Sequence, residues 1–296
     1  MNKEEQLRWQ TSFAVPAAAA AFTALACQIG QIALFASGLE DRPGIEPLPD
    51  EYLSIDQNPG QFIAAGVARA IGVIALGVVF YYLFRLIRAR GGHVPRWFIY
   101  LVFAGPILFA IGAVLGALDQ VDKAEEFAGQ EVIRGDRGDD VASDLSNDTS
   151  PLVYAPTFAG TIGVAFLFVM LPLRARAVGL LSPFMAILGV ICGALLVLPL
   201  VPSPVMTAFW LGALGLLFLD RWPGGRGPAW ESGEAEPWPS PAQRRGLVQR
   251  DDDGGAADDD DSRYAPADSN GSGADAEGEA EPVPDRPASR KRRRKG

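Results

Sequence analysis

The chain has 296 residues and a net charge of −9, and hydrophobic residues make up 49% of it. Nearly all Leu, Ile, Val and Phe residues lie between residues 13 and 220, while residues 221–296 are rich in Pro, Gly, Asp, Glu and Arg. Several apolar stretches reach the roughly 18 residues that predict a bilayer-spanning helix. This distribution excludes an ordinary soluble domain and predicts an all-α, polytopic integral membrane protein.

Six apolar segments have the length and composition of transmembrane helices. At about 1.5 Å per residue, most of them reach the hydrocarbon thickness of about 30 Å. The first segment is too long for the apolar region of a signal peptide, so we expect an uncleaved helix. In chain order, the expected spans are Phe13–Ala36, Phe62–Ile87, Trp97–Leu118, Leu152–Leu173, Leu180–Leu198 and Val205–Leu219.

The last two spans belong to one apolar block that three prolines interrupt. Pro199, Pro202 and Pro204 lie close together inside residues 180–219. Proline lacks an amide donor and disfavours helix in the preceding residue. We therefore expect a tight hairpin with a short sixth helix, and a re-entrant hairpin is the alternative.

Along the chain, loops rich in basic residues alternate with loops rich in acidic residues. Arg88, Arg90 and Arg96 follow the second span, and Arg174 and Arg176 follow the fourth without an accompanying acid. By the positive-inside rule, these loops are cytoplasmic. Both termini are then cytoplasmic as well, which requires an even number of spans and agrees with six.

This orientation divides the chain into three parts. They are a cytoplasmic N-terminus at 1–12, a six-helix transmembrane domain at 13–220 and a cytoplasmic tail at 221–296. Within the domain, the loops at about 37–61 and 119–151 are acidic and face outward. The Ala-, Gly- and Arg-rich, Lys-poor composition favours a bacterial plasma membrane.

The tail is expected to be disordered from about residue 224. It contains few aliphatic residues, so it cannot bury enough surface to offset the loss of chain entropy on folding. Its basic end is a candidate site for anionic lipid or for a protein partner, and the acidic net charge argues against nucleic acid. The basic residues at this end are Arg290, Lys291, Arg292, Arg293, Arg294 and Lys295.

Catalytic and metal-binding sequence patterns are missing from the chain. The single histidine, His93, is in a short loop, and Cys27 and Cys192 lie in apolar stretches without metal-ligand spacing. No HExxH, GxSxG, P-loop or GxGxxG pattern occurs. No Asp or Glu lies well inside a predicted span, which argues against a proton-coupled carrier. We therefore expect no enzyme activity and no cofactor.

A small polar set is expected in the outer half of the bundle. Gln28 and Gln31 share a face of the first span, Arg69 lies about two turns inside the second, and Asp119 and Asp122 end the third. Interhelical hydrogen bonds and an outward-reaching arginine explain this set most simply. The alternative is a polar pocket or an ion path. We expect Arg69 to pair with Asp119 or to hydrogen-bond Gln28 and Gln31.

Two functions fit these features. The first is a non-enzymatic scaffold or accessory protein whose tail recruits a protein partner or anionic lipid. The second is a small transporter or channel that uses the polar set around Arg69. A continuous hydrated cavity passing Arg69 would favour transport, and a tightly packed bundle would favour the scaffold.

Overall fold

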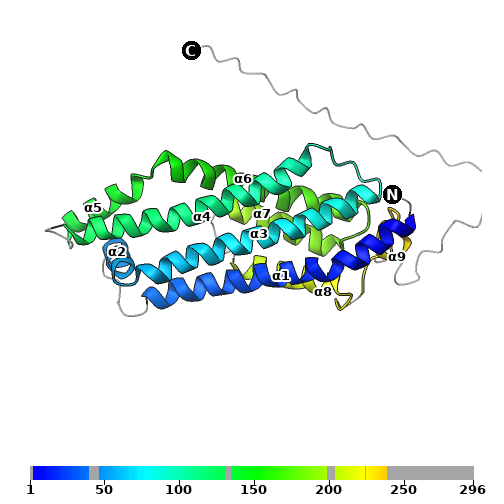
Figure 1. Ribbon diagram of the computed structural model, residues 1–296, viewed down its shortest axis with the longest axis horizontal. Coiled ribbons are helices and arrows are strands. Elements are labelled where there is room, and N and C mark those ends of the chain that lie inside the picture. The colour runs from blue at the N-terminus through cyan, green and yellow to red at the C-terminus, as the bar shows by residue number, and fades with distance from the viewer. Residues whose placement is uncertain (1–2, 40–46, 131–134, 199–203, 224, 239–296) are drawn as a thin grey trace, which may run out of the picture. The chain divides into compact units, whose positions relative to one another are not determined.

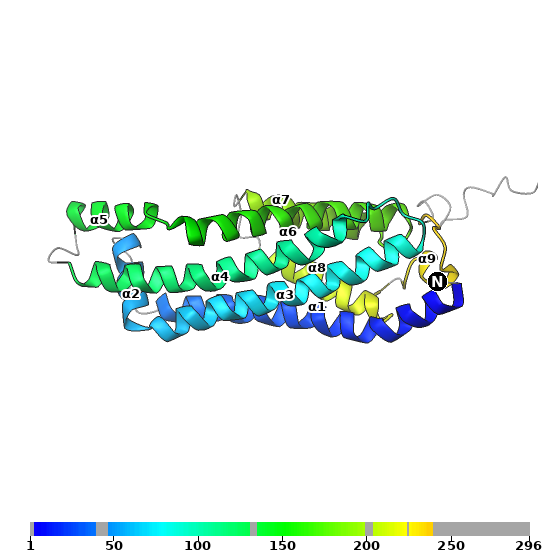
Figure 2. The same ribbon diagram turned by 45° about the horizontal axis from the view of Figure 1, so that its top comes forward.

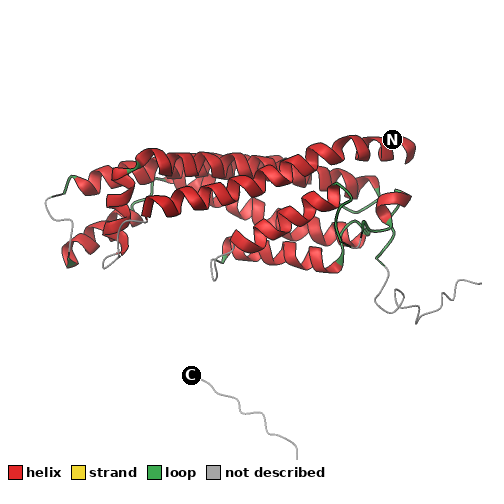
Figure 3. Ribbon diagram, turned by 90° about the horizontal axis from the view of Figure 1, so that it is seen from below, coloured by secondary structure: helices red, strands yellow, loops and turns green. Residues whose placement is uncertain are grey.

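A computed structural model describes residues 3–39, 47–130, 135–198, 204–223 and 225–238. These residues form helices joined by short loops, and none of them forms a strand (Figure 3). In chain order the helices of the described residues are α1 (Lys3–Leu39), α2 (Pro47–Gln57), α3 (Pro59–Ala89), α4 (Phe98–Ala128), α5 (Asp136–Asn147), α6 (Pro151–Ala177), α7 (Pro183–Val197), α8 (Pro204–Phe218) and α9 (Ala229–Ser232).

Four of the described helices are long and apolar enough to cross a membrane: α1, α3, α4 and α6. They contain 37, 31, 31 and 27 residues. At about 1.5 Å per residue, each exceeds the hydrocarbon thickness of about 30 Å. They run side by side in the order α1, α3, α4, α6 (Figures 1 and 2). The expected all-helical architecture is confirmed, and the four helices indicate an integral membrane protein.

Helices α7 and α8 are much shorter than these four. Each has 15 residues. At the standard rise, each is only about 22 Å long. Both start at a proline. Proline is favoured in the first turn of a helix, because the backbone N–H that it lacks would have no partner within the helix there. They lie in the half of the helical unit nearer α9, where α7 packs on α6 and α8 packs on α1 (Figures 1 and 2). Residues 199–203, where the turn between them is expected, lie outside the described residues.

The two acidic segments expected to be outer loops contain helices. Helix α2, the last turns of α4 and helix α5 pack together at one end of the unit, which we call the α2–α5 end (Figure 1). Tyr52, Ile55, Phe127 and Ala142 are buried in a small separate core there, and the Tyr52 and Phe127 ring centroids lie 5.5 Å apart. The loop prediction followed average polarity. It overlooked apolar residues spaced three or four apart, which give each short helix one apolar face.

At the opposite end of the unit, the packed chain continues beyond residue 224, where the disordered tail was expected to start. Residues 225–238, here called the return segment, pack against the start of α1 and the α6–α7 connection. Trp230 is only 2% exposed, and its indole N–H donates to the Leu180 carbonyl at 2.8 Å. Gln6 Nε2 donates to the Gly233 carbonyl at 3.1 Å. The low aliphatic content of this stretch suggested disorder, but a single large aromatic side chain buries enough surface to anchor it.

Arg90 joins three elements at this α9 end. Its Nε donates to the Ala229 carbonyl at 2.9 Å, and one Nη donates to Gln10 Oε1 at 2.6 Å. The other Nη donates to the Leu86 carbonyl of its own helix at 3.2 Å. Arg90 is 5% exposed, and this burial lowers its pKa to about 10. The start of α1, the end of α3 and α9 therefore lie at the same end of the unit.

Candidate functional site

A half-open cavity of about 800 Å³ lies between the helices toward the α2–α5 end. Pockets that bury small molecules usually have roughly 300–1,000 Å³, so this cavity is large enough for a ligand. We call it the Arg69 cavity. Helices α1 to α6 contribute to its wall, and its main lining residues are Gln31, Phe35, Glu51, Phe62, Arg69, Phe109, Gly116, Asp119, Lys123 and Thr157.

The position of the cavity follows from the lengths of the helices. Helices α7 and α8 are short and lie in the half of the unit nearer α9. The other half, which contains the cavity, is therefore formed mainly by the four long helices and by α2 (Figures 1 and 2). The middle of the α4 wall, between Phe109 and Asp119, consists of Gly112, Ala113, Gly116 and Ala117. These positions share one face of the helix, and their small side chains leave space beside it.

Not every glycine of that wall faces open space. A Cβ atom on Gly112 would lie 2.4 Å from Thr157 Oγ1 and 2.7 Å from the Thr157 backbone, so α4 and α6 touch there. A Cβ atom on Gly116 would meet only Val153 Cγ1, at 3.9 Å. The first glycine therefore permits close helix packing. The second borders the cavity and could carry a larger side chain.

Arg69 provides the positive charge of the cavity. It is the eleventh residue of α3, which places it roughly 15 Å along the helix from its start. The guanidinium carbon lies over the Phe109 ring, 4.9 Å from the centroid. Among the residues that the structure describes, Arg69 has no hydrogen-bond or ion-pair partner. An aromatic ring thus supports this cation, and no carboxylate of the described residues neutralises it.

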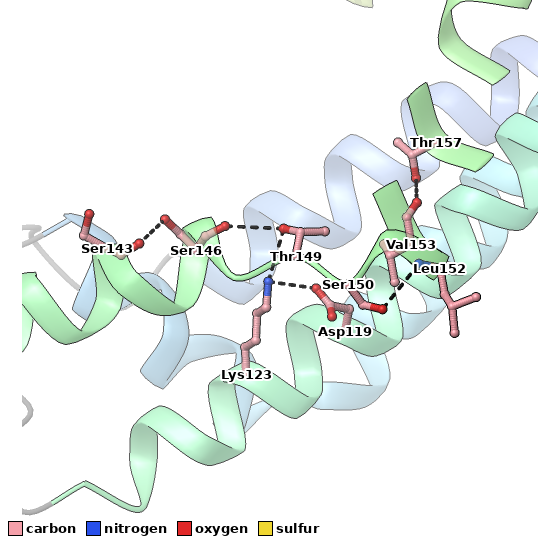
Figure 4. Close-up of polar contacts among 9 residues, drawn as sticks. All are labelled: Asp119, Lys123, Ser143, Ser146, Thr149, Ser150, Leu152, Val153 and Thr157. Atoms are coloured by element: carbon pink, nitrogen blue, oxygen red, sulfur yellow. Dashed lines mark hydrogen bonds and ion pairs between the residues drawn. The ribbon is translucent and has the colours of Figure 1, made fainter. Parts of the chain in front are cut away.

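The expected pair between Arg69 and Asp119 is not formed. Asp119 instead accepts from Lys123 Nζ at 2.9 Å, and the same Nζ is 3.4 Å from Thr149 Oγ1 (Figure 4). Asp119 lies ten residues beyond Phe109 on α4, or roughly 15 Å along the helix axis. Lys123 is one turn away on the same helix, so it is the nearer partner.

The other predicted polar residues separate into two groups. Gln31 lines the cavity together with Arg69 and Asp119. Gln28 and Asp122 are not among the lining residues. The basic run Arg290–Lys295, predicted to bind lipid or a partner, lies outside the described residues.

Several lining residues were not predicted from the sequence. Phe109 resembles any core aromatic, and Lys123 and Glu51 resemble residues of solvated loops. One sequence signal could have indicated the cavity. It is the set of small residues on one face of α4, at positions 112, 113, 116 and 117, opposite a helix that carries an arginine.

The end of the cavity beside α2, here called the mouth, differs in charge from the end at Arg69, here called the deep end. Glu51 on α2 and Asp119 on α4 contribute carboxylates, and Lys123, the only lysine among the described lining residues, is already paired. Burial raises the pKa of Glu51 above its ordinary value. The pKa of Tyr52 is also raised, first by burial and then by the nearby charges of Glu51 and Asp119. Among the lining residues that the structure describes, those of the mouth are therefore net acidic, and Arg69 makes the deep end positive.

Tightly packed side chains lie between the cavity and the α9 end. Within the described ranges, the cavity lining does not extend past Arg69 on α3 or Phe109 on α4. Beyond that level Phe80 and Trp210 are fully buried, and the Phe168 ring lies 5.1 Å from each of their rings. The half-open cavity therefore lies on the α2–α5 side of these packed side chains and does not continue through them.

The described residues offer little for metal chemistry. In the ranges given above, no three His, Cys, Asp or Glu side chains are grouped so that they could hold a metal ion. The chemistry of the cavity is instead that of one arginine, a mostly apolar wall and a polar mouth.

No protein-family model, no curated protein and no solved structure matches this chain. Its class therefore follows from its own architecture. Four helices that are long and apolar enough to cross a membrane indicate an integral membrane protein. Within that class, the distinguishing feature is the half-open cavity that contains an arginine.

Proposed function

We propose that this chain is a non-enzymatic membrane accessory protein that binds a small molecule in the Arg69 cavity from the extracytoplasmic side. The observation that carries this proposal is a half-open cavity of about 800 Å³ in the half of the unit nearer the α2–α5 end, with buried aromatic residues between it and the α9 end. A pocket of this size with a few polar groups in an apolar wall is typical of ligand binding.

The proposed orientation puts the α9 end in the cytoplasm. Arg85, Arg88 and Arg96 lie near the end of α3 and the start of α4, and Arg174 and Arg176 lie near the end of α6. All of these chain positions are at the α9 end, as the positive-inside rule requires of a cytoplasmic face. The contacts between the start of α1 and the return segment support a common side for both termini.

For α7 and α8 we favour the re-entrant hairpin over two complete spans. Each helix is about 22 Å long, less than the roughly 30 Å of a hydrocarbon layer. Such a hairpin enters and leaves on the cytoplasmic side. The termini therefore remain on one side with either four or six spans, and the acidic helices α2 and α5 face outward.

Binding without transport agrees better with the packing than a carrier does. A carrier must expose the same site to both faces of the membrane. Here the route toward the α9 end is filled by Phe80, Phe168 and Trp210, whose rings are in contact. The scaffold function predicted for the tail is compatible with this proposal. In that case ligand binding and partner recruitment use different parts of the chain.

Filling the cavity tests this proposal. Gly116→Leu places a side chain into the cavity, because only Val153 lies within 4 Å of its Cβ position. Gly30→Leu is the matched control, because nothing lies within 4 Å of that Cβ position and residue 30 is not part of the lining. Both changes remove a helical glycine, so both add similar helix propensity.

The measurement is mass spectrometry of small molecules that copurify with the full-length protein in nanodiscs. We expect a compound that is retained by the unmodified protein and by Gly30→Leu, and that is depleted in Gly116→Leu. Identical profiles for all three proteins would contradict a ligand-binding cavity.

A further inference from the structure

We infer that the ligand of the Arg69 cavity is an amphipathic organic anion, with one acidic group bound by Arg69 and an apolar body along the cavity wall. This inference rests on the proposed function, because it assumes that the cavity binds a ligand. It goes further by giving the sign of the ligand's charge, the number of its charges and the character of its body.

The charge of Arg69 is not compensated by any carboxylate of the described residues. A cation in an apolar helix is unfavourable unless a partner or water satisfies it. The described residues supply no anionic partner, since the Asp119 carboxylate is paired with Lys123 at 2.9 Å. An acid group on the ligand would provide the partner, and a guanidinium can bind a carboxylate or phosphate through two parallel hydrogen bonds.

Phe109 supports the guanidinium without using a hydrogen-bond acceptor. The guanidinium carbon lies over the Phe109 ring at 4.9 Å from the centroid. A cation–π contact forms no N–H···O hydrogen bond, and a guanidinium has five N–H donors. The donors of Arg69 therefore remain available to a ligand while the ring holds the group in place.

The charges of the described lining residues limit the charge of the ligand. Among those residues, Arg69 is the only arginine, and the only lysine, Lys123, is already paired. A second negative charge near the mouth would approach the carboxylates of Glu51 and Asp119. A ligand with one acidic group therefore fits better than a dianion. A cationic ligand would be repelled by Arg69 at the deep end.

Apolar side chains from three helices line the cavity together with Arg69. Ile32 and Phe35 from α1, Ile55 from α2 and Phe62 from α3 line the cavity. Such a wall gains free energy from an apolar ligand, about 0.8 kcal/mol for each buried methylene group. A single acyl chain or a compact apolar body satisfies it, so we assign the ligand to single-chain carboxylates and related acids.

The experiment compares probes that share one chain and differ in the head group. Octanoate, octyl phosphate, octanol and octylamine are titrated into full-length protein in nanodiscs of zwitterionic lipid, with empty nanodiscs as the background. We expect octanoate, with one negative charge, to bind at least tenfold more tightly than octanol. It should also bind more tightly than octyl phosphate, which carries nearly two negative charges at neutral pH, and octylamine should bind most weakly. The two anions distinguish a carboxylate source from a phosphate source.

Variants then assign the preference to Arg69. Arg69→Gln should lower anion affinity about tenfold, as expected for loss of a charge-assisted hydrogen bond, and should leave octanol binding within about twofold. Arg69→Lys should keep most of the anion preference. Arg88→Gln is the matched control, because it removes an exposed arginine from the same helix outside the cavity.

The outcomes separate this inference from the proposed function. Equal binding of all four probes, abolished by Gly116→Leu, would refute the anion and leave the binding cavity intact. An anion preference that persists in Arg69→Gln would also refute it. Binding of no probe above empty nanodiscs would count against both. The comparison of probes on the unmodified protein decides the matter even if a variant does not fold.

Discussion

Arg69 illustrates, at the scale of single residues, how an apolar helix accommodates a charge. An arginine at a helix centre costs about 2.5–3.5 kcal/mol on insertion scales. The segment Phe62–Ile87 also contains fourteen Leu, Ile, Val and Phe residues. At roughly 0.3–0.6 kcal/mol each, these favour insertion by about 4–8 kcal/mol. The helix can therefore insert with an arginine that no carboxylate neutralises.

This balance predicts a mild effect for Arg69→Leu. Membrane insertion should be unchanged, and the free energy of unfolding should fall by less than about 2 kcal/mol, the range of a cation–π contact. No carboxylate is left unpaired, because Asp119 remains bonded to Lys123. Lys123→Ala should be more harmful, since it leaves a partly buried aspartate without its partner. Chemical unfolding in micelles measures both, and the reverse order would contradict the observed pairing.

The raised pKa of Glu51 predicts that the stability of the folded protein depends on pH. Burial raises its pKa in the folded protein, so the folded state holds this proton more tightly than the unfolded state. The resulting stabilisation is fully present below the ordinary glutamate pKa of about 4.3 and is lost as pH rises through the higher folded value. Glu51→Gln should remove this part of the pH dependence. Thermal unfolding of both proteins from acid to neutral pH measures it, and parallel curves would contradict the prediction.

At the scale of secondary-structure elements, the α2–α5 end behaves as a unit with its own core. Phe127 is fully buried there beside Tyr52. Phe127→Ala should raise hydrogen exchange in α2 and α5 and leave the second half of α3 protected, because the two hydrophobic cores are separate. Phe158→Ala, at a site that is 54% exposed, is the control. Uniform loss of protection would show that the two cores unfold together.

The sequence predicted elements well where the signal is local and less well where it depends on distant residues. Each of the six apolar segments coincides largely with a helix, because roughly 20 apolar residues have few alternatives to a helix in lipid. The return segment was missed because its anchor, Trp230, is stabilised by a carbonyl 50 residues away. Helices α2 and α5 were missed because each is short and lies in an acidic segment, where the few apolar residues of one helical face are easily overlooked.

The candidate site was predicted in part for similar reasons. Arg69, Gln31 and Asp119 could be selected because a polar residue near an apolar span is conspicuous. Their pairing could not, since it depends on how far α4 is shifted along α3. A glycine that packs two helices and a glycine that borders a cavity are also identical in sequence, as Gly112 and Gly116 show.

At the scale of the whole molecule, the proposed topology predicts the side of each loop. Reporters fused after Arg90, after Arg176 and at the C-terminus should all be cytoplasmic, and a reporter after Arg137 should be external. Fusion after Arg90 is best made in addition to an intact copy of the chain, because Arg90 contacts the return segment. An external C-terminus would contradict both the four-span and the six-span arrangement.

The basic end of the tail is predicted to bind anionic lipid. Six consecutive basic residues, Arg290–Lys295, can each gain about 1 kcal/mol near an anionic leaflet. The 16 acids in residues 221–296 and screening by salt reduce this sum. A tail peptide should float with anionic liposomes at low salt and not with neutral ones. Equal flotation with both kinds of liposome, or with neither, would contradict the lipid prediction. Binding of the peptide to nucleic acid in place of lipid would make nucleic acid the ligand of this basic run.

The return segment also has a consequence for how the protein is made. Gln6 emerges from the ribosome among the first residues, yet its carbonyl partner, Gly233, is synthesised 227 residues later. Until then, the start of α1 and the Arg90 guanidinium must remain hydrated or be held by a chaperone. Release of the nascent chain after α8 would leave these groups exposed. Such truncated chains would therefore be recognisable to quality-control proteases, although every apolar helix had already been translated.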